Sequence, residues 1–100
     1  MNMLINTLLQ ERHRIEYMLN RYYSELEELP KGSVYEKKSN GKVYYYLKYR
    51  NKGRVISQYV CKNDVEDIKQ KVERRKHIEA MIKSLQEEKS IADSALEGRI

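Results

Sequence analysis

The apolar residues of the first 29 positions recur at alternating steps of three and four along the chain. This spacing places them on one side of a helix, as a seam of four heptads with one polar interruption. The seam consists of Ile5, Leu8, Arg12, Ile15, Leu19, Tyr22, Leu26 and Leu29. Neither glycine nor proline occurs before Pro30, where the LPKG segment ends the pattern. The sequence therefore predicts a long helix over residues 1–29.

A second apolar stripe with helical spacing follows near the other end of the chain. It consists of Val65, Ile68, Val72, Ile78, Ile82 and Leu85, and its phase slips by one residue around Arg75. This stripe predicts a second long helix over residues 63–90, with residues 91–100 as a frayed tail or a helical extension. Two helices of similar length that flank a compact insert indicate an antiparallel, coiled-coil-like pair. The first seam can also pair with another copy of the chain, so a homodimer through the helices stays open.

Strand and turn signals fill residues 33–61 between the two helices. Asn40-Gly41 is a strong hairpin signal, because both residues tolerate positive φ. We interpret Asn51-Lys52-Gly53 as a three-residue loop, with glycine at the left-handed position. The strands are then residues 33–39, 42–50 and 54–61, joined as an antiparallel β-meander. The predicted fold is α+β, a single domain over residues 1–100.

The turns set the register of this meander, and the register decides which side chains share a face. A two-residue first turn pairs Tyr35 with Tyr46, and a three-residue second loop pairs Arg50 with Arg54, Tyr49 with Val55 and Tyr45 with Tyr59. One face then carries Val34, Val43, Tyr45, Leu47, Tyr49, Val55 and Tyr59, and we expect it to pack on the helices. The other carries Tyr35, Lys37, Lys42, Tyr44, Tyr46, Lys48, Arg50, Arg54, Ile56 and Gln58, without a carboxylate.

Charge makes the second face a candidate binding site. The chain has a formal net charge of +5, and residues 30–62 hold nine basic residues against one acidic residue, Glu36. Cations neutralise phosphates, and tyrosine rings stack on bases, so this face is predicted to bind DNA or RNA, or a nucleoprotein. The predicted binding residues are Tyr35, Lys37, Lys42, Tyr44, Tyr46, Lys48, Arg50 and Arg54. A protein partner, or an exposed strand face without any ligand, are the alternatives.

Other classes of protein are disfavoured. No window approaches the roughly 18 apolar residues of a membrane span, and the N-terminal segment lacks a secretory pattern, so we expect a cytoplasmic protein without membrane contact. Cys61 is the single cysteine, expected to be a buried thiol, and it allows no internal disulfide. Glu73 and His77 have the i, i+4 spacing of metal ligands, but two ligands make a weak site. We therefore expect no catalytic site, metal or cofactor, and no enzyme.

Three short motifs between Leu29 and Val60 carry a resemblance: LPKGS, YYYLKYR, and GR followed closely by SQYV. They are similar to those of small uncharacterised bacterial and phage proteins with a helix–meander–helix domain. More loosely, three strands followed by a helix resemble the arm-binding domains of phage-type integrases, which read DNA with a three-stranded sheet. The uncharacterised family implies no established activity. From the basic, tyrosine-rich sheet face we expect a small non-enzymatic nucleic-acid-binding accessory protein of phage or mobile-element origin. The alternative is a phage-encoded inhibitor or adaptor, anti-CRISPR-like, that binds a nucleic-acid enzyme or its guide RNA.

Overall fold

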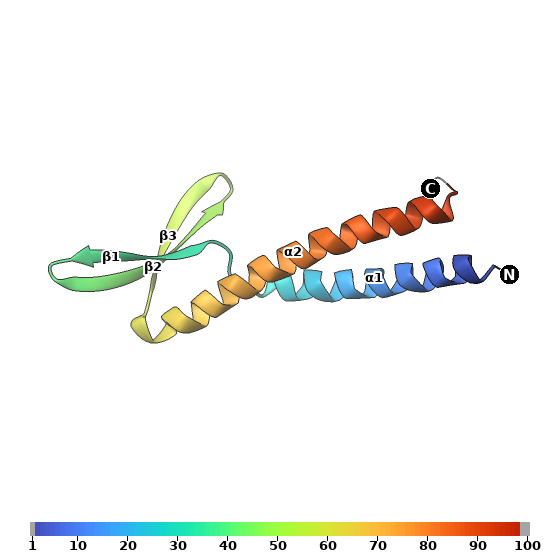
Figure 1. Ribbon diagram of the computed structural model, residues 1–100. Coiled ribbons are helices and arrows are strands. Elements are labelled where there is room, and N and C mark those ends of the chain that lie inside the picture. Colours follow the sequence, from blue (N-terminus) through green and yellow to red (C-terminus); the bar gives the residue numbers. More distant parts are fainter. Residues whose placement is uncertain (1, 99–100) are drawn as a thin grey trace. The chain divides into compact units, whose positions relative to one another are not determined.

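The structure is a computed structural model that describes residues 2–98 (Figure 1). Its elements are α1 (Met3–Glu27), β1 (Ser33–Ser39), β2 (Lys42–Asn51), β3 (Arg54–Val60), a 3₁₀ turn (Lys62–Asp64) and α2 (Val65–Leu96). The predicted α+β fold of helix, three-stranded meander and helix is confirmed. Contacts within the chain gather in two compact units, which we describe separately. The sheet unit is Leu29–Lys76, and the helix-pair unit consists of the residues up to Glu28 and those from His77 onward.

The sheet unit contains one antiparallel sheet with the strand order β1-β2-β3. Strands β1 and β2 form a hairpin (Figure 1). Asn40 and Gly41 at its turn both have positive φ, 52° and 77°, as a type I′ turn requires. Val34 lies opposite Leu47, and Tyr35 lies opposite Tyr46. The predicted register of this hairpin is therefore confirmed.

One face of the sheet packs on the first turns of α2. The buried core of the sheet unit consists of Leu47, Val60, Val65 and Val72, with Val34, Tyr45, Tyr49 and Ile68 packed against it. The chain just after α1 is attached to the same helix, because Arg75 Nη1 donates a hydrogen bond to the Leu29 carbonyl oxygen at 2.8 Å. Arg75 is half-buried and occupies the position where the apolar stripe of α2 breaks.

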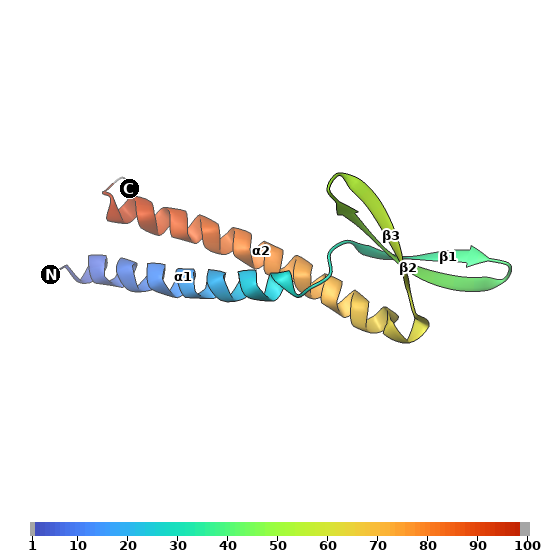
Figure 2. The same cartoon turned by 180° about the vertical axis from the view of Figure 1, so that it is seen from behind.

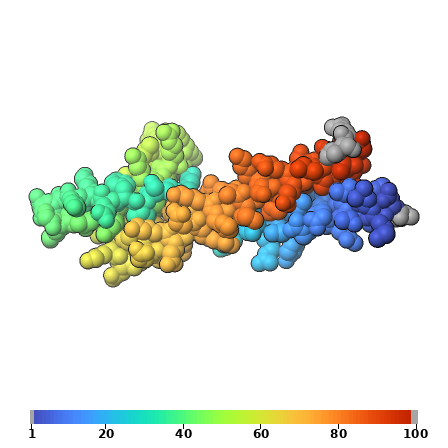
Figure 3. Space-filling model, viewed as in Figure 1, coloured from blue at the N-terminus to red at the C-terminus, as the bar shows by residue number. Residues whose placement is uncertain are grey.

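The helix-pair unit is antiparallel, because contacts from α1 reach α2 in reverse order (Figures 1 and 2). Arg12 Nη1 lies 3.5 Å from Asp93 Oδ1, whereas Gln86 Nε2 donates to the Tyr23 hydroxyl at 2.6 Å. The buried apolar residues of this unit are Ile15, Leu19, Ile78, Ile82, Leu85 and Ala92. Side chains fill the space between the two ribbons of this pair (Figure 3). The predicted pair of helices is confirmed, although its seam is buried best at the centre and Ile5 is 45% exposed.

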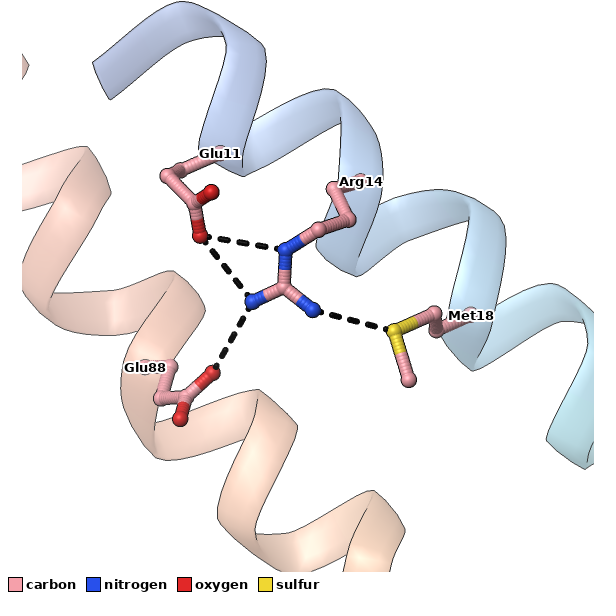
Figure 4. Close-up of polar contacts among 4 residues, drawn as sticks. All are labelled: Glu11, Arg14, Met18 and Glu88. Carbon is pink, nitrogen blue, oxygen red and sulfur yellow. Dashed lines mark hydrogen bonds and ion pairs between the residues drawn. The ribbon is translucent and has the colours of Figure 1, made fainter. Parts of the chain in front are cut away.

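A polar cluster around Arg14 links the two helices at the surface (Figure 4). Arg14 donates to Glu11 Oε2 from Nε and Nη2, at 3.1 and 3.0 Å, and Nη2 lies 3.7 Å from Glu88 Oε2. Its Nη1 points at the Met18 sulfur. The hydrogen bond to Glu11 raises the pKa of Arg14, so the guanidinium stays charged. Because these groups are exposed, the cluster orients side chains more than it stabilises the fold.

The second helix differs from its predicted limits at both ends. It begins at Val65, after the 3₁₀ turn, and continues to Leu96, so most of residues 91–100 form the helical extension rather than a frayed tail. The phase slip in its apolar stripe falls close to the boundary between the two units. Val65 and Val72 lie in the core of the sheet unit, whereas Ile78 and Ile82 are buried in the helix-pair unit. One helix therefore contributes two apolar stripes, one to each core.

Gly32, in the LPKGS motif, lies close against the backbone of β2. Its φ is +109°, and a Cβ atom there would lie 2.1 Å from the Lys48 carbonyl oxygen. We expect Gly32→Ala to lower the free energy of unfolding by about 3 kcal/mol, since left-handed backbone and a backbone clash act together. Gly41→Ala is the matched control, because Gly41 also has positive φ but nothing lies near its Cβ position. Urea unfolding followed by circular dichroism measures both, and equal losses would contradict the close approach.

Asp93 is a partly exposed carboxylate whose ion pairs give the helix-pair unit a small contribution to stability that depends on pH. Its carboxylate accepts a hydrogen bond from Lys89 Nζ at 3.1 Å, which lowers the pKa of Asp93, and Arg12 lowers it further. The folded state therefore favours the carboxylate. This contribution to stability is complete above the unfolded pKa of about 3.9 and is lost as the pH falls through the lower folded value. We expect Asp93→Asn to lower the melting temperature at neutral pH but not at pH values below the folded pKa. Thermal unfolding across a pH series tests this, and an equal difference at every pH would exclude it.

Candidate nucleic-acid interface

The second turn of the sheet differs from its predicted form. It has two residues, Lys52 and Gly53, with φ of 50° and 79°, and Asn51 is the last residue of β2. Arg54 therefore pairs with Asn51, Val55 with Arg50, Ile56 with Tyr49, Tyr59 with Tyr46 and Val60 with Tyr45. The predicted pairs Arg50–Arg54, Tyr49–Val55 and Tyr45–Tyr59 are wrong by one residue. Because a slip of one residue exchanges the two faces of a strand, every side chain of β3 lies on the opposite face from its prediction.

We call the sheet face that points away from the α2 core the outer face. By the observed pairing it carries Ser33, Tyr35, Lys37, Ser39, Lys42, Tyr44, Tyr46, Lys48, Arg50, Val55, Ser57 and Tyr59. Seven of the eight predicted binding residues lie together on it: Tyr35, Lys37, Lys42, Tyr44, Tyr46, Lys48 and Arg50. The eighth, Arg54, is on the other face, with Ile56 and Gln58. Tyr59 and Val55, expected in the core, are exposed on the outer face, and Val60 takes the core position instead.

Three rings cross the middle of the outer face, one from each strand, and we call them the tyrosine row: Tyr35, Tyr46 and Tyr59. The ring centroids of Tyr35 and Tyr46 are 5.5 Å apart with planes 21° from parallel, and those of Tyr46 and Tyr59 are 5.9 Å apart in an edge-to-face arrangement. The Tyr35 hydroxyl shares a hydrogen bond of 3.0 Å with Ser57 Oγ. These contacts fix the positions of the rings on the sheet surface.

Four cations flank the tyrosine row on the outer face: Lys37, Lys42, Lys48 and Arg50. All four are exposed, and none of them forms an ion pair within residues 2–98. Glu36, the single acidic residue of the strands, pairs with Tyr45 and so lies on the other face. The outer face therefore presents charge of one sign around an aromatic centre.

Sequence reasoning missed Tyr59, because the alternation of β3 does not identify its buried side. One set of alternate residues is Val55, Ser57 and Tyr59, and the other is Ile56, Gln58 and Val60, so each set contains two apolar or aromatic residues. The turn alone decides between them. The available signal was the Lys52-Gly53 dipeptide read as a two-residue turn, which has the same length as Asn40-Gly41.

The features considered for other chemistry lie apart from the outer face. Cys61 is exposed just after β3, not buried as expected, because it begins the connection to the 3₁₀ turn. No group of three or more histidine, cysteine or acidic residues in the described chain is arranged to hold a metal ion. Within the same residues, neither helix has an apolar run that could cross a membrane.

Comparison with known proteins places the chain in a family without an assigned activity. Residues 7–70 match the family model described as a domain of unknown function (DUF6788), so the chain belongs to that family. This confirms the expectation of a small uncharacterised family. The match includes the whole sheet and therefore every residue of the outer face. No curated protein and no solved structure matches the chain.

Lys52 occupies a left-handed position that suits asparagine better, and this gives a test of the second turn. A residue other than glycine, asparagine or aspartate pays about 1–2 kcal/mol there. We expect Lys52→Asn to raise the free energy of unfolding by about 0.5–1 kcal/mol, and the reciprocal Asn40→Lys to lower it by a similar amount. Chemical unfolding of both variants measures the effect. The three-residue loop would instead gain nothing from asparagine at position 52, because its left-handed residue is Gly53 alone.

Proposed function

We propose that the protein is a non-enzymatic accessory protein that binds nucleic acid through the outer face of its sheet. The observation that supports this is the composition of that face, which has four cations and four tyrosines and no carboxylate. A surface selected only for solubility mixes both signs of charge. Cross-strand contacts between tyrosines explain why the rings suit the sheet, but they do not explain the exclusion of acids.

The spacing of the outer face suits a phosphate backbone. Along β2 the outward residues are Lys42, Tyr44, Tyr46, Lys48 and Arg50, and alternate residues of a strand lie about 7 Å apart. Cations on this strand can each neutralise a phosphate and release its counterions, while the rings contact sugars or bases. The opposite face of the sheet packs on α2, so the strands that carry the binding residues are held in place by a packed core.

The test is fluorescence anisotropy with labelled oligonucleotides over a series of salt concentrations, comparing two double variants. Lys48→Ala/Arg50→Ala removes two outer-face cations. Lys38→Ala/Arg54→Ala is the matched control, because it removes the same charge from the other face of the same sheet. We expect the outer-face variant to bind more weakly and to lose about 1.4–1.8 from the slope of log K against log salt, which corresponds to two phosphate contacts.

The control variant should keep the slope of the unaltered protein. Equal effects of the two variants would show that net charge alone drives binding and would refute the assignment of the face. Absence of binding to every oligonucleotide would favour the alternative, in which the same face binds an acidic groove of a protein as an inhibitor or adaptor.

A further inference from the structure

We infer that the outer face binds single-stranded nucleic acid, DNA or RNA, by stacking unpaired bases on the outer rings of the tyrosine row. The inference rests on the proposed function and narrows its ligand. It depends on Tyr59, which the observed register moves from the core to the outer face, where it is 56% exposed. With Tyr35, 36% exposed, it gives the row one accessible ring at each end.

The rings are held in place before any ligand binds. Tyr46 is half-buried and contacts both neighbours, stacked on Tyr35 and edge-to-face with Tyr59. Ser57 on β3 holds the hydroxyl of Tyr35 from the opposite edge strand. A ring with few accessible rotamers loses little conformational entropy when a base stacks on it, so fixed rings favour binding.

The chemistry of the face selects unpaired bases over a duplex. In a duplex the flat faces of the bases are stacked on one another, and only their edges are accessible in the grooves. Sheets that read such edges use arginine, asparagine or glutamine side chains aimed at base atoms. The centre of the outer face has rings and the Ser57 hydroxyl instead, while Gln58 lies on the other face. Rings on a sheet surface stack on the bases of single strands, which expose their faces.

The cations are placed to hold the backbone on both sides of the row. On β2, Lys42 precedes Tyr46 by four residues and Arg50 follows it by four, about 13 Å each way along the strand. Lys48 lies closer, about 7 Å from Tyr46, and Lys37 extends the positive charge onto β1. A strand whose bases stack on the row therefore meets a cation before and after the stacked bases.

The experiment uses the full chain and four probes of equal length: single-stranded DNA, single-stranded RNA, a DNA duplex and an abasic DNA strand. We expect Tyr59→Ala to weaken binding of both single strands on the order of 10-fold without changing the salt slope. Tyr59→Phe is the matched control, because it keeps the ring, and it should bind within about two-fold of the unaltered protein. The abasic strand should bind at least as weakly as Tyr59→Ala binds the normal strand, because it cannot stack on Tyr35 either, and the substitution should not weaken its binding further.

A second variant keeps the test decisive if Tyr59→Ala fails to fold. The chain contains no tryptophan, so Tyr59→Trp introduces a single tryptophan, whose emission is distinct from that of the tyrosines and which retains an aromatic face. We expect its emission to be quenched by single strands and to be unchanged by the duplex or the abasic strand. Tighter binding of RNA than DNA would indicate contacts to the 2′-hydroxyl, and either preference supports the inference.

Two results would overturn the inference, and they have different consequences for the proposed function. If the duplex binds as tightly as single strands, and Tyr59→Ala has no effect while Lys48→Ala/Arg50→Ala still weakens binding, the face binds phosphates but does not stack bases. The proposed function then stands without the inference. If none of the four probes binds, both are refuted.

Discussion

The register of the antiparallel sheet is the constraint on which the rest of the sheet unit depends. Two turns with paired positive φ, Asn40-Gly41 and Lys52-Gly53, set it. Because side chains alternate with a period of two, the same pairing that buries Leu47 and Val60 against α2 places every outward cation and ring on one surface. A change in either turn would exchange buried and exposed residues along a whole strand. Core and candidate interface are therefore two consequences of one hydrogen-bond pattern.

The second helix has to serve two small cores. Neither unit is large enough to enclose a sizeable core without it. Within each unit, α2 supplies the apolar wall that the other elements need: Val65 and Val72 for the sheet, Ile78 and Ile82 for α1. A helix has 3.6 residues per turn, so the one-residue slip between these pairs rotates the apolar stripe by about 100°. Arg75, at the slip, donates a hydrogen bond to the Leu29 carbonyl oxygen and adds no apolar side chain to either stripe.

Most of the fold could be predicted from the sequence, because its signals are local and agree with one another. The first helix follows from its heptad spacing, and the first hairpin follows from Asn40-Gly41. The second hairpin was predicted wrongly because Asn51, a residue that favours left-handed backbone, directly precedes Lys52, a residue that does not. In the observed register Lys52 takes that conformation and Val60 packs in the core of the sheet unit. The alternation of β3 does not separate the two registers, because each set of alternate residues contains two apolar or aromatic side chains, and so the predicted site includes Arg54 and omits Tyr59.

The three consecutive tyrosines of β2 show how the register of the sheet limits the number of rings available for the proposed binding. Tyr45 packs in the core, whereas Tyr44 and Tyr46 lie on the outer face, so the run serves two faces of one sheet. The scaffold behind Tyr46 is packed, and little ordering would accompany binding. Four outer-face cations can release the counterions of at most about four phosphates, which limits the salt slope to about −3 for a single strand. Binding free energy beyond this contribution from counterion release has to come from the rings. The exposed rings of the outer face are Tyr35 and Tyr59, which lie at the two ends of the tyrosine row.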